Sequence, residues 1–103
     1  MIVGDQPVVA AGVYTQNVVH AASIDWNRAR TPGAQLRGVV INSGNANACT
    51  GEQGVADNEE FARLAATELG SEPDQILVLS TGIIGEPLPM DKISVGTQQA
   101  GAD

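Results

Sequence analysis

Two short apolar runs and the helical stretch between them decide the expected fold. Leu36–Ile41 reads L-R-G-V-V-I and Gln75–Leu79 reads Q-I-L-V-L, and a polar segment that contains glycine follows each run. Short apolar runs of this kind are typical of buried strands. Between them, Val55–Leu69 carries apolar residues at helical spacing, and Gly70 suits the position just after a helix. The pattern predicts strand, helix, strand.

This order of elements predicts the fold class. A strand–helix–strand unit of about forty residues usually joins two parallel strands, because the connection is long enough to cross back over the sheet. We therefore expect an α/β fold, with a mixed sheet and helices packed on it. A sheet in which the two strands are not neighbours remains open at this stage. Residues 1–103 have the length of a single α/β domain.

The flanking segments predict four further elements. Val8–Thr15 (V-V-A-A-G-V-Y-T) is expected to form a strand with a glycine at its middle, and Ala21–Trp26 a weaker extended segment. Arg30–Ala34 contains the Pro-Gly pair of a surface turn. Pro89–Gly101 begins with proline, which suits the first turn of a helix, so we expect a helix there.

Composition and charge exclude several function classes. The chain carries five basic and 12 acidic residues, a formal charge of −7, and no basic stripe to neutralise phosphates, which disfavours nucleic-acid and anionic-membrane partners. Cys49 is the single cysteine, so an intrachain disulfide and a cysteine metal cluster are excluded. The sequence has no apolar run long enough to span a bilayer and no secretory leader, which indicates a cytoplasmic protein.

The polar segments after the two predicted strands are the candidate sites, because ligands gather at the carboxyl ends of strands in α/β sheets. The first, Asn42–Gly51, lacks the glycine spacing of a dinucleotide loop and the lysine of a phosphate loop. A loop that is held by its own Asn and Ser hydrogen bonds is one interpretation. A small-molecule or nucleotide binding module that uses this turn is another.

The second segment, Ser80–Met90, favours acyl-transfer chemistry. The tetrahedral oxyanion of that reaction needs two pre-aimed donors, and a threonine hydroxyl beside a glycine N–H can supply them. Thr81 and Gly82 offer this pair, since Gly82 has no Cβ to obstruct a substrate and Thr81 has a restricted χ1. We expect both residues in a bend directly after the Gln75–Leu79 strand.

The chain offers no complete set of catalytic groups. Ser43 and Ser80 lack the surroundings of a nucleophilic serine, and Cys49 has no basic neighbour in sequence to lower its pKa. His20 could act as a general base. Its apolar neighbours make a structural or surface role the simpler interpretation.

Three motifs together resemble one family. They are Val40–Gly51 (V-I-N-S-G-N-A-N-A-C-T-G), Ser80–Ile93 (S-T-G-I-I-G-E-P-L-P-M-D-K-I) and Ala11–Asn17 (A-G-V-Y-T-Q-N), in which Tyr14 replaces the usual phenylalanine. Their order and content resemble the bifunctional ornithine acetyltransferase / glutamate N-acetyltransferase family of arginine biosynthesis. The resemblance covers most of the chain.

The resemblance implies a reaction and its participants. Family members transfer an acetyl group from N-acetylornithine to glutamate, some also from acetyl-CoA, without a bound cofactor. Their precursor cleaves itself at an Ala-Thr bond, and the freed threonine of the β chain attacks the acetyl group. The fold it implies is a larger two-chain αββα-type enzyme. Carried onto this sequence, the oxyanion hole of the family is Thr81 and Gly82.

The sequence also departs from the family pattern. The segment with the nucleophilic threonine does not occur in residues 1–103, and Ala66-Thr67 lies mid-helix without its flanking pattern. We therefore expect a fragment of the α chain that is inactive alone, belongs in a hetero-oligomer of α and β chains, and leaves apolar faces uncovered. Such a fragment is expected to be marginally stable or to self-associate. A degenerate remnant without activity remains the third interpretation.

Overall fold

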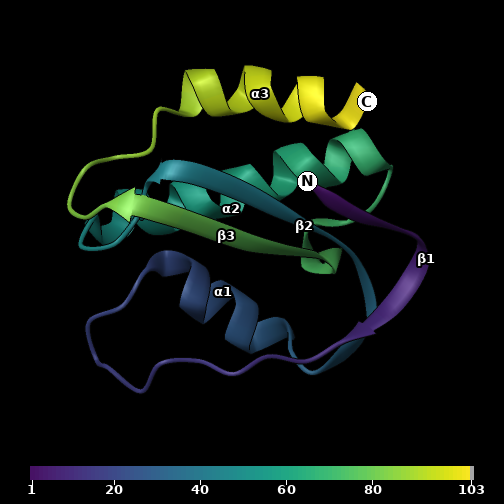
Figure 1. The fold of residues 1–103 in the computed structure, drawn as a ribbon, viewed down its shortest axis with the longest axis horizontal. Coiled ribbons are helices and arrows are strands. Elements are labelled where there is room, and N and C mark those ends of the chain that lie inside the picture. The colour runs from purple at the N-terminus through teal and green to yellow at the C-terminus, as the bar shows by residue number, and fades with distance from the viewer. Residues whose placement is uncertain (103) are drawn as a thin grey trace.

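The computed structural model describes residues 1–102. Figure 1 shows the order of its elements along the chain. They are β1 (Ile2–Ala10), α1 (Ala22–Arg30), β2 (Gly33–Asn45), α2 (Gly51–Leu69), a 3-10 turn (Pro73–Gln75), β3 (Ile76–Ile83) and α3 (Met90–Ala102). The expected α/β class is confirmed.

The three strands form one mixed sheet in the order β1-β2-β3. β2 and β3 are parallel neighbours, as the strand–helix–strand pattern predicted, with Val40 opposite Val78 in the register. β1 pairs antiparallel with the first half of β2, from Ala10 opposite Gly33 to Ile2 opposite Val39. The crossover through α2 therefore joins two adjacent parallel strands, and β3 lies at the edge of the sheet.

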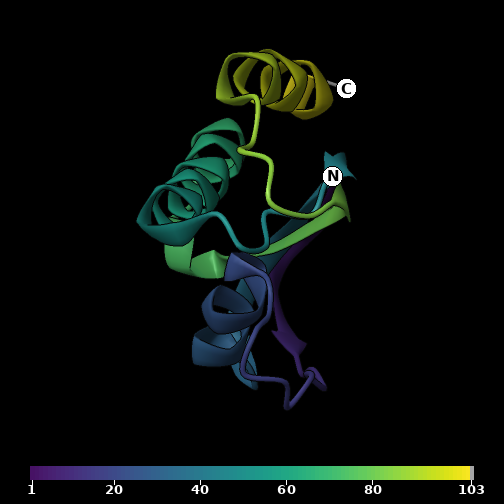
Figure 2. The same cartoon turned by 90° about the vertical axis from the view of Figure 1, so that its left-hand side faces the viewer.

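All three helices lie on one side of the sheet, as Figure 2 shows. The face of the sheet toward α2 is apolar, because alternate residues of a strand point to the same side. Alanines on α2 let the helix approach the strands closely. The core consists of Val40, Phe61, Ala62, Ala65, Ala66, Ile76, Val78, Leu88 and Ile93.

Both predicted strands are longer than the apolar runs that revealed them. β2 continues to Asn45 and β3 to Ile83. The expected bend directly after Leu79 is therefore wrong, because Ser80–Ile83 keeps pairing with Asn42–Asn45 residue by residue. Polar and glycine residues ended the hydrophobic pattern in sequence, but the backbone pairing did not need apolar side chains.

The segment Ala21–Trp26 was expected to be extended, and this prediction is wrong. Residues Ala22–Arg30 form α1, which packs against the free edge of β3 (Figure 1). The Trp26 indole N–H donates to the carbonyl of Ile76 at 2.8 Å. Contacts made across the fold, which the local pattern does not reveal, stabilise this helix.

The predicted strand Val8–Thr15 is correct only at its beginning. β1 runs from Ile2 to Ala10, and the chain from residue 11 to residue 20 forms an irregular connection to α1. Since Ala10 is opposite Gly33, the first residue of β2, the chain beyond Ala10 has no strand to pair with. The expected turn around Pro32 joins α1 to β2, and its Thr31–Pro32 peptide is cis.

The two predicted helices are confirmed, with extended boundaries. α2 begins at Gly51, four residues before the predicted start, and α3 occupies nearly the whole of the predicted range. Gly70 caps α2 in the left-handed conformation, and the Ser71 N–H donates to the carbonyl of Ala66 at 2.9 Å. This bond closes the end of the helix.

The face of the sheet away from the helices is uncovered (Figure 2). Four large apolar residues on that face are 46–64% exposed: Ile2, Ile41, Leu79 and Ile83. The uncovered apolar face expected of a fragment is thus present. Among residues 1–102, no helix has the length and apolar character needed to cross a bilayer.

Candidate active site at the carboxyl ends of β2 and β3

The two polar segments singled out in the sequence lie side by side. In the parallel register Asn42 is opposite Ser80, Ser43 opposite Thr81, and Gly44 opposite Gly82. The contact continues one residue beyond β2, where the Ala46 N–H donates to the carbonyl of Ile83 at 2.8 Å. The fold therefore brings the first four residues of each motif into one cluster at the carboxyl edge of the sheet.

Gly44 and Gly82 touch each other through their backbones. Both have a positive φ, 132° and 127° respectively, which residues with a side chain rarely adopt. A Cβ on Gly82 would lie 2.3 Å from both the carbonyl carbon and oxygen of Gly44. A Cβ on Gly44 would meet no atom within 4 Å. Space and conformation both require glycine at 82, and conformation alone favours it at 44.

A partly buried hydrogen-bond network lies beside this contact. The Ser80 hydroxyl donates to the carbonyl of Asn45 at 2.5 Å, and the Asn42 side-chain amide donates to the Ser80 Oγ at 3.1 Å. The same amide lies 3.4 Å from the Asn45 carbonyl. Ser80 is only 9% exposed. This network could not be predicted from the sequence, because it depends on the register that places Asn42 opposite Ser80.

The second half of the Asn42–Gly51 segment is tied to its own chain. Asn47, 1% exposed, donates from its side-chain amide to the carbonyl of Gly54 at 2.8 Å. Its side-chain oxygen accepts from the Thr50 hydroxyl at 2.7 Å. The interpretation of a self-hydrogen-bonded loop is confirmed here. A nucleotide module is not favoured, since these polar groups already have protein partners.

Thr81 and Gly82 are exposed at the end of β3. Neither residue lines either of the two cavities that are described below. Thr81 lies on the uncovered face of the sheet, because it alternates with Ser80, whose side chain faces the helices. The two residues are therefore accessible to a substrate or to another part of a longer protein.

The larger cavity, about 370 Å³, lies between β2 and α3. Asn42, Ser43 and Asn45 line it from the strand, and Lys92 lines it from the helix. It thus borders the same strand end as the network around Ser80.

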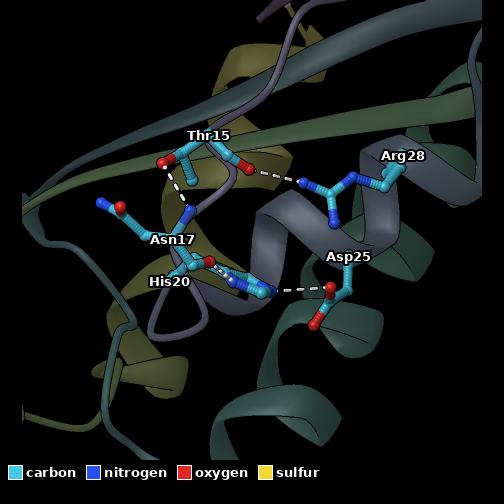
Figure 3. Close-up of polar contacts among 5 residues, drawn as sticks. All are labelled: Thr15, Asn17, His20, Asp25 and Arg28. Atoms are coloured by element: carbon cyan, nitrogen blue, oxygen red, sulfur yellow. Dashed lines mark hydrogen bonds and ion pairs between the residues drawn. The ribbon is translucent and has the colours of Figure 1, made fainter.

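A second cavity of about 280 Å³ brings His20, Asp25 and Cys49 together. Figure 3 shows how His20 is held: Nδ1 lies 2.8 Å from the carbonyl of Asn17, and Nε2 lies 2.8 Å from Asp25 Oδ1. Both partners are acceptors, so the ring satisfies them together only when both nitrogens carry protons. These bonds, first that to Asn17 and then that to Asp25, raise the pKa of His20.

His20 therefore fits a structural role better than that of a general base. With both ring nitrogens hydrogen-bonded, His20 links the connection between β1 and α1 to the helix. Arg28 joins the same connection to α1, because its guanidinium donates to the carbonyl of Thr15 at 2.7 Å (Figure 3). Cys49 is exposed and shares the cavity with His20, a proximity that their separation in sequence did not reveal.

These features define the class of protein. A parallel strand pair whose polar, glycine-containing ends lie together is typical of the site-bearing edge of an α/β protein. The family follows from comparison with known sequences: the model of the ArgJ family matches residues 1–103. The chain belongs to the ArgJ family, and the resemblance seen in the three motifs is confirmed.

Individual relatives agree with this assignment. The chain is 57% identical over 96 residues to the arginine biosynthesis bifunctional protein ArgJ of Symbiobacterium thermophilum, covering 93% of this chain and 24% of that protein. It is 46% identical over 100 residues to the protein of the same name from Rhodopirellula baltica, covering 97% and 24%. The chain thus spans about a quarter of the length of these curated relatives.

Two crystal structures have the same fold. Ornithine acetyltransferase from Mycobacterium tuberculosis, solved as a complex with ornithine, superposes with a TM-score of 0.90 at 39% identity. The match covers 97% of this chain and 54% of that one. The bifunctional protein ArgJ from Bacillus halodurans superposes with a TM-score of 0.89 at 38% identity, covering 94% and 51%.

Proposed function

We propose that this chain is part of an acetyltransferase of arginine biosynthesis that transfers an acetyl group from N-acetylornithine to glutamate. The observation that carries the proposal is the family match over residues 1–103. The names of the relatives and the ornithine complex of the M. tuberculosis structure support it. Acetyl-CoA is a possible second donor. The complete enzyme is assigned to the cytoplasm.

Within that enzyme we assign the oxyanion hole to Thr81 and Gly82. In the reaction, a threonine hydroxyl oxygen attacks the acetyl carbonyl carbon, and the carbonyl oxygen becomes the oxyanion. Collapse of this intermediate breaks the C–N bond, and the proton lost by the hydroxyl leaves with the ornithine amine. The glutamate amine then attacks the acetyl-threonine in the same way. Two donors stabilise the negative charge at each step.

The position of Gly82 supports this assignment. Val78 exchanges two hydrogen bonds with the side chain of Asn27 at the free edge of β3, so its backbone groups point away from β2. Alternate residues of a strand direct their backbone groups to the same edge. The N–H of Gly82, four residues on, is therefore directed to that free edge. The Thr81 side chain lies on the uncovered face of the sheet.

The nucleophile must come from elsewhere in the longer protein. We assign it to a threonine of the β chain, freed by cleavage of the precursor at an Ala-Thr bond, whose own amine serves as the base. The chain of residues 1–103 is then the α-chain fragment of a hetero-oligomer and is inactive alone. The uncovered apolar face of the sheet is consistent with a missing partner.

The test is Thr81→Ala in the complete protein. Loss of one oxyanion donor typically costs about 10²–10³ in kcat, whereas Thr81→Ser keeps the hydroxyl and should retain most activity. Thr67→Ala is the matched control, because Thr67 is an exposed threonine whose hydroxyl donates to the carbonyl of Arg63 within α2. An unchanged kcat in Thr81→Ala, with the fold intact, would remove the assigned role.

A further inference from the structure

We propose that Asn42 and Ser80 are positioning residues, which fix the place of the Thr81–Gly82 donors through the carbonyl of Asn45. This inference rests on the proposed function of Thr81 and Gly82. It gives the first half of the Asn42–Gly51 motif a role that is distinct from ligand binding. The two residues touch no substrate in this scheme and act only through the backbone.

Ser80 is fully occupied by the network. Its hydroxyl donates its one proton to the Asn45 carbonyl and accepts from the Asn42 amide. A hydroxyl with a donor on one side and an acceptor on the other is fixed in orientation. Ser80 immediately precedes Thr81, so an anchored Ser80 side chain fixes the backbone from which the Thr81 side chain and the Gly82 N–H project.

The carbonyl of Asn45 is the other end of the anchor. Gly44, with its φ of 132°, directly precedes Asn45 at the end of β2, and the Asn45 carbonyl accepts from the Ser80 hydroxyl and lies 3.4 Å from the Asn42 side-chain amide. The Ser80 hydroxyl holds this carbonyl in place. The bond therefore links the last residue of β2 to β3.

Gly82 lies close against the same end of β2. A Cβ on Gly82 would lie 2.3 Å from the Gly44 carbonyl and 2.9 Å from the Asn45 nitrogen, so Gly82 rests on the peptide group that joins those two residues. A shift of this peptide shifts Gly82 with it. Because catalysis falls by about 10²-fold for a misplacement of about 1 Å, a small release of the anchor is enough to lower turnover.

A purely structural role makes a different prediction. Asn27 is a suitable comparison, because its side-chain amide also binds β3, with bonds of 2.7 and 2.9 Å to Val78. It anchors the strand two residues before Ser80 and has no contact with the Asn45 carbonyl. If Asn42 and Ser80 only stabilise the fold, their removal should affect the enzyme as the removal of Asn27 does.

The experiment compares variants of the complete protein in steady-state acetyl transfer, at a temperature where circular dichroism shows all of them folded. We expect Ser80→Ala and Asn42→Ala to lower kcat about 10- to 100-fold with KM changed less than threefold. Asn27→Ala should leave kcat within about twofold of wild type. Ser80→Thr, which keeps the hydroxyl, should recover most of the lost turnover.

A double-mutant cycle then separates positioning from an independent effect. If Ser80 acts through the donors, Ser80→Ala should cost at least threefold less in a Thr81→Ala background than in the wild type, because interacting residues are not additive. Equal losses in both backgrounds would overturn the inference, as would equal kcat losses in Ser80→Ala and Asn27→Ala. A full effect of Thr81→Ala with none from Ser80→Ala and Asn42→Ala would refute this inference alone. No effect of Thr81→Ala would refute the proposed function itself.

Discussion

The contact between Gly44 and Gly82 gives the sharpest prediction about stability. In Gly82→Ala the new Cβ would lie 2.3 Å from the Gly44 carbonyl, more than an ångström inside ordinary contact, which begins at 3.4 Å. The neighbouring atoms are backbone and cannot rotate away. Overpacking of this kind costs about 1–3 kcal/mol. The positive φ of 127° adds backbone strain of about 1–3 kcal/mol for an L residue.

Alanine substitutions at two other glycines, Gly44 and Gly96, separate the cost of overpacking from the cost of backbone strain. Gly44→Ala carries only the strain of its positive φ, because its Cβ would meet no atom within 4 Å. It should therefore cost about 1–3 kcal/mol, against about 2–6 kcal/mol for Gly82→Ala. Gly96→Ala, in α3 with open space around it, should stabilise the chain by about 0.5–1 kcal/mol.

Urea unfolding of the chain measures this order directly. Trp26 is the single tryptophan, and its indole N–H is bonded to β3, so its fluorescence reports on the packing of α1 against the sheet. We expect the urea concentration at the midpoint to decrease in the order Gly96→Ala, wild type, Gly44→Ala, Gly82→Ala, at constant m-value. Equal midpoints for Gly44→Ala and Gly82→Ala would refute the close backbone approach on which the site geometry depends.

Three further predictions concern the rest of the chain. The His20 pKa is raised in the folded state by its bonds to Asn17 and Asp25, so its contribution to stability should be complete below the unfolded value of about 6.5 and lost as the pH rises through the folded pKa. The urea midpoint of wild type relative to His20→Gln should fall over that range, and a flat difference would contradict the doubly bonded imidazolium. Asn27→Ala should cost about 2–4 kcal/mol, because it leaves the N–H and carbonyl of a buried β3 residue without partners; a loss below 1 kcal/mol in the same assay would mean that water replaces the amide. Phe61→Ala should cost about 3–5 kcal/mol, since Phe61 is 3% exposed in the core, whereas Val95→Ala, 54% exposed, should stay within about 0.5 kcal/mol of wild type; similar thermal shifts for the two variants would contradict the described core.

Much of the fold could be predicted from local patterns. The runs around Val40 and Val78 and the helical stripe through Phe61 were identified because buried segments leave a periodic record in sequence. These elements form the core and fix the parallel pair. The position of the candidate site followed from them, since the polar residues directly after two neighbouring strands must lie at one edge.

Other features could not be predicted because their partners are distant in sequence. The prediction that Ala21–Trp26 is extended missed α1, because the buried residues of this helix, Ser23 and Asn27, are polar and give no apolar stripe. The Asn27 side chain is hydrogen-bonded to the backbone of Val78, which lies 51 residues further along the chain. The hydrogen bonds between Asn42 and Ser80 and between His20 and Asp25 likewise could not be predicted from the local sequence.

The spacing of apolar residues along the chain was enough to predict the α/β class and the α2 crossover, and the family motifs are visible in the sequence. Three features became known only from the folded chain: Ser80–Ile83 remains in the sheet, Gly82 lies against Gly44, and the Ser80 hydroxyl binds the Asn45 carbonyl. The physical reason is that periodicity reports burial, which each segment carries in its own side chains. Hydrogen bonds and backbone contacts between segments depend on register, which is fixed only when the strands pair.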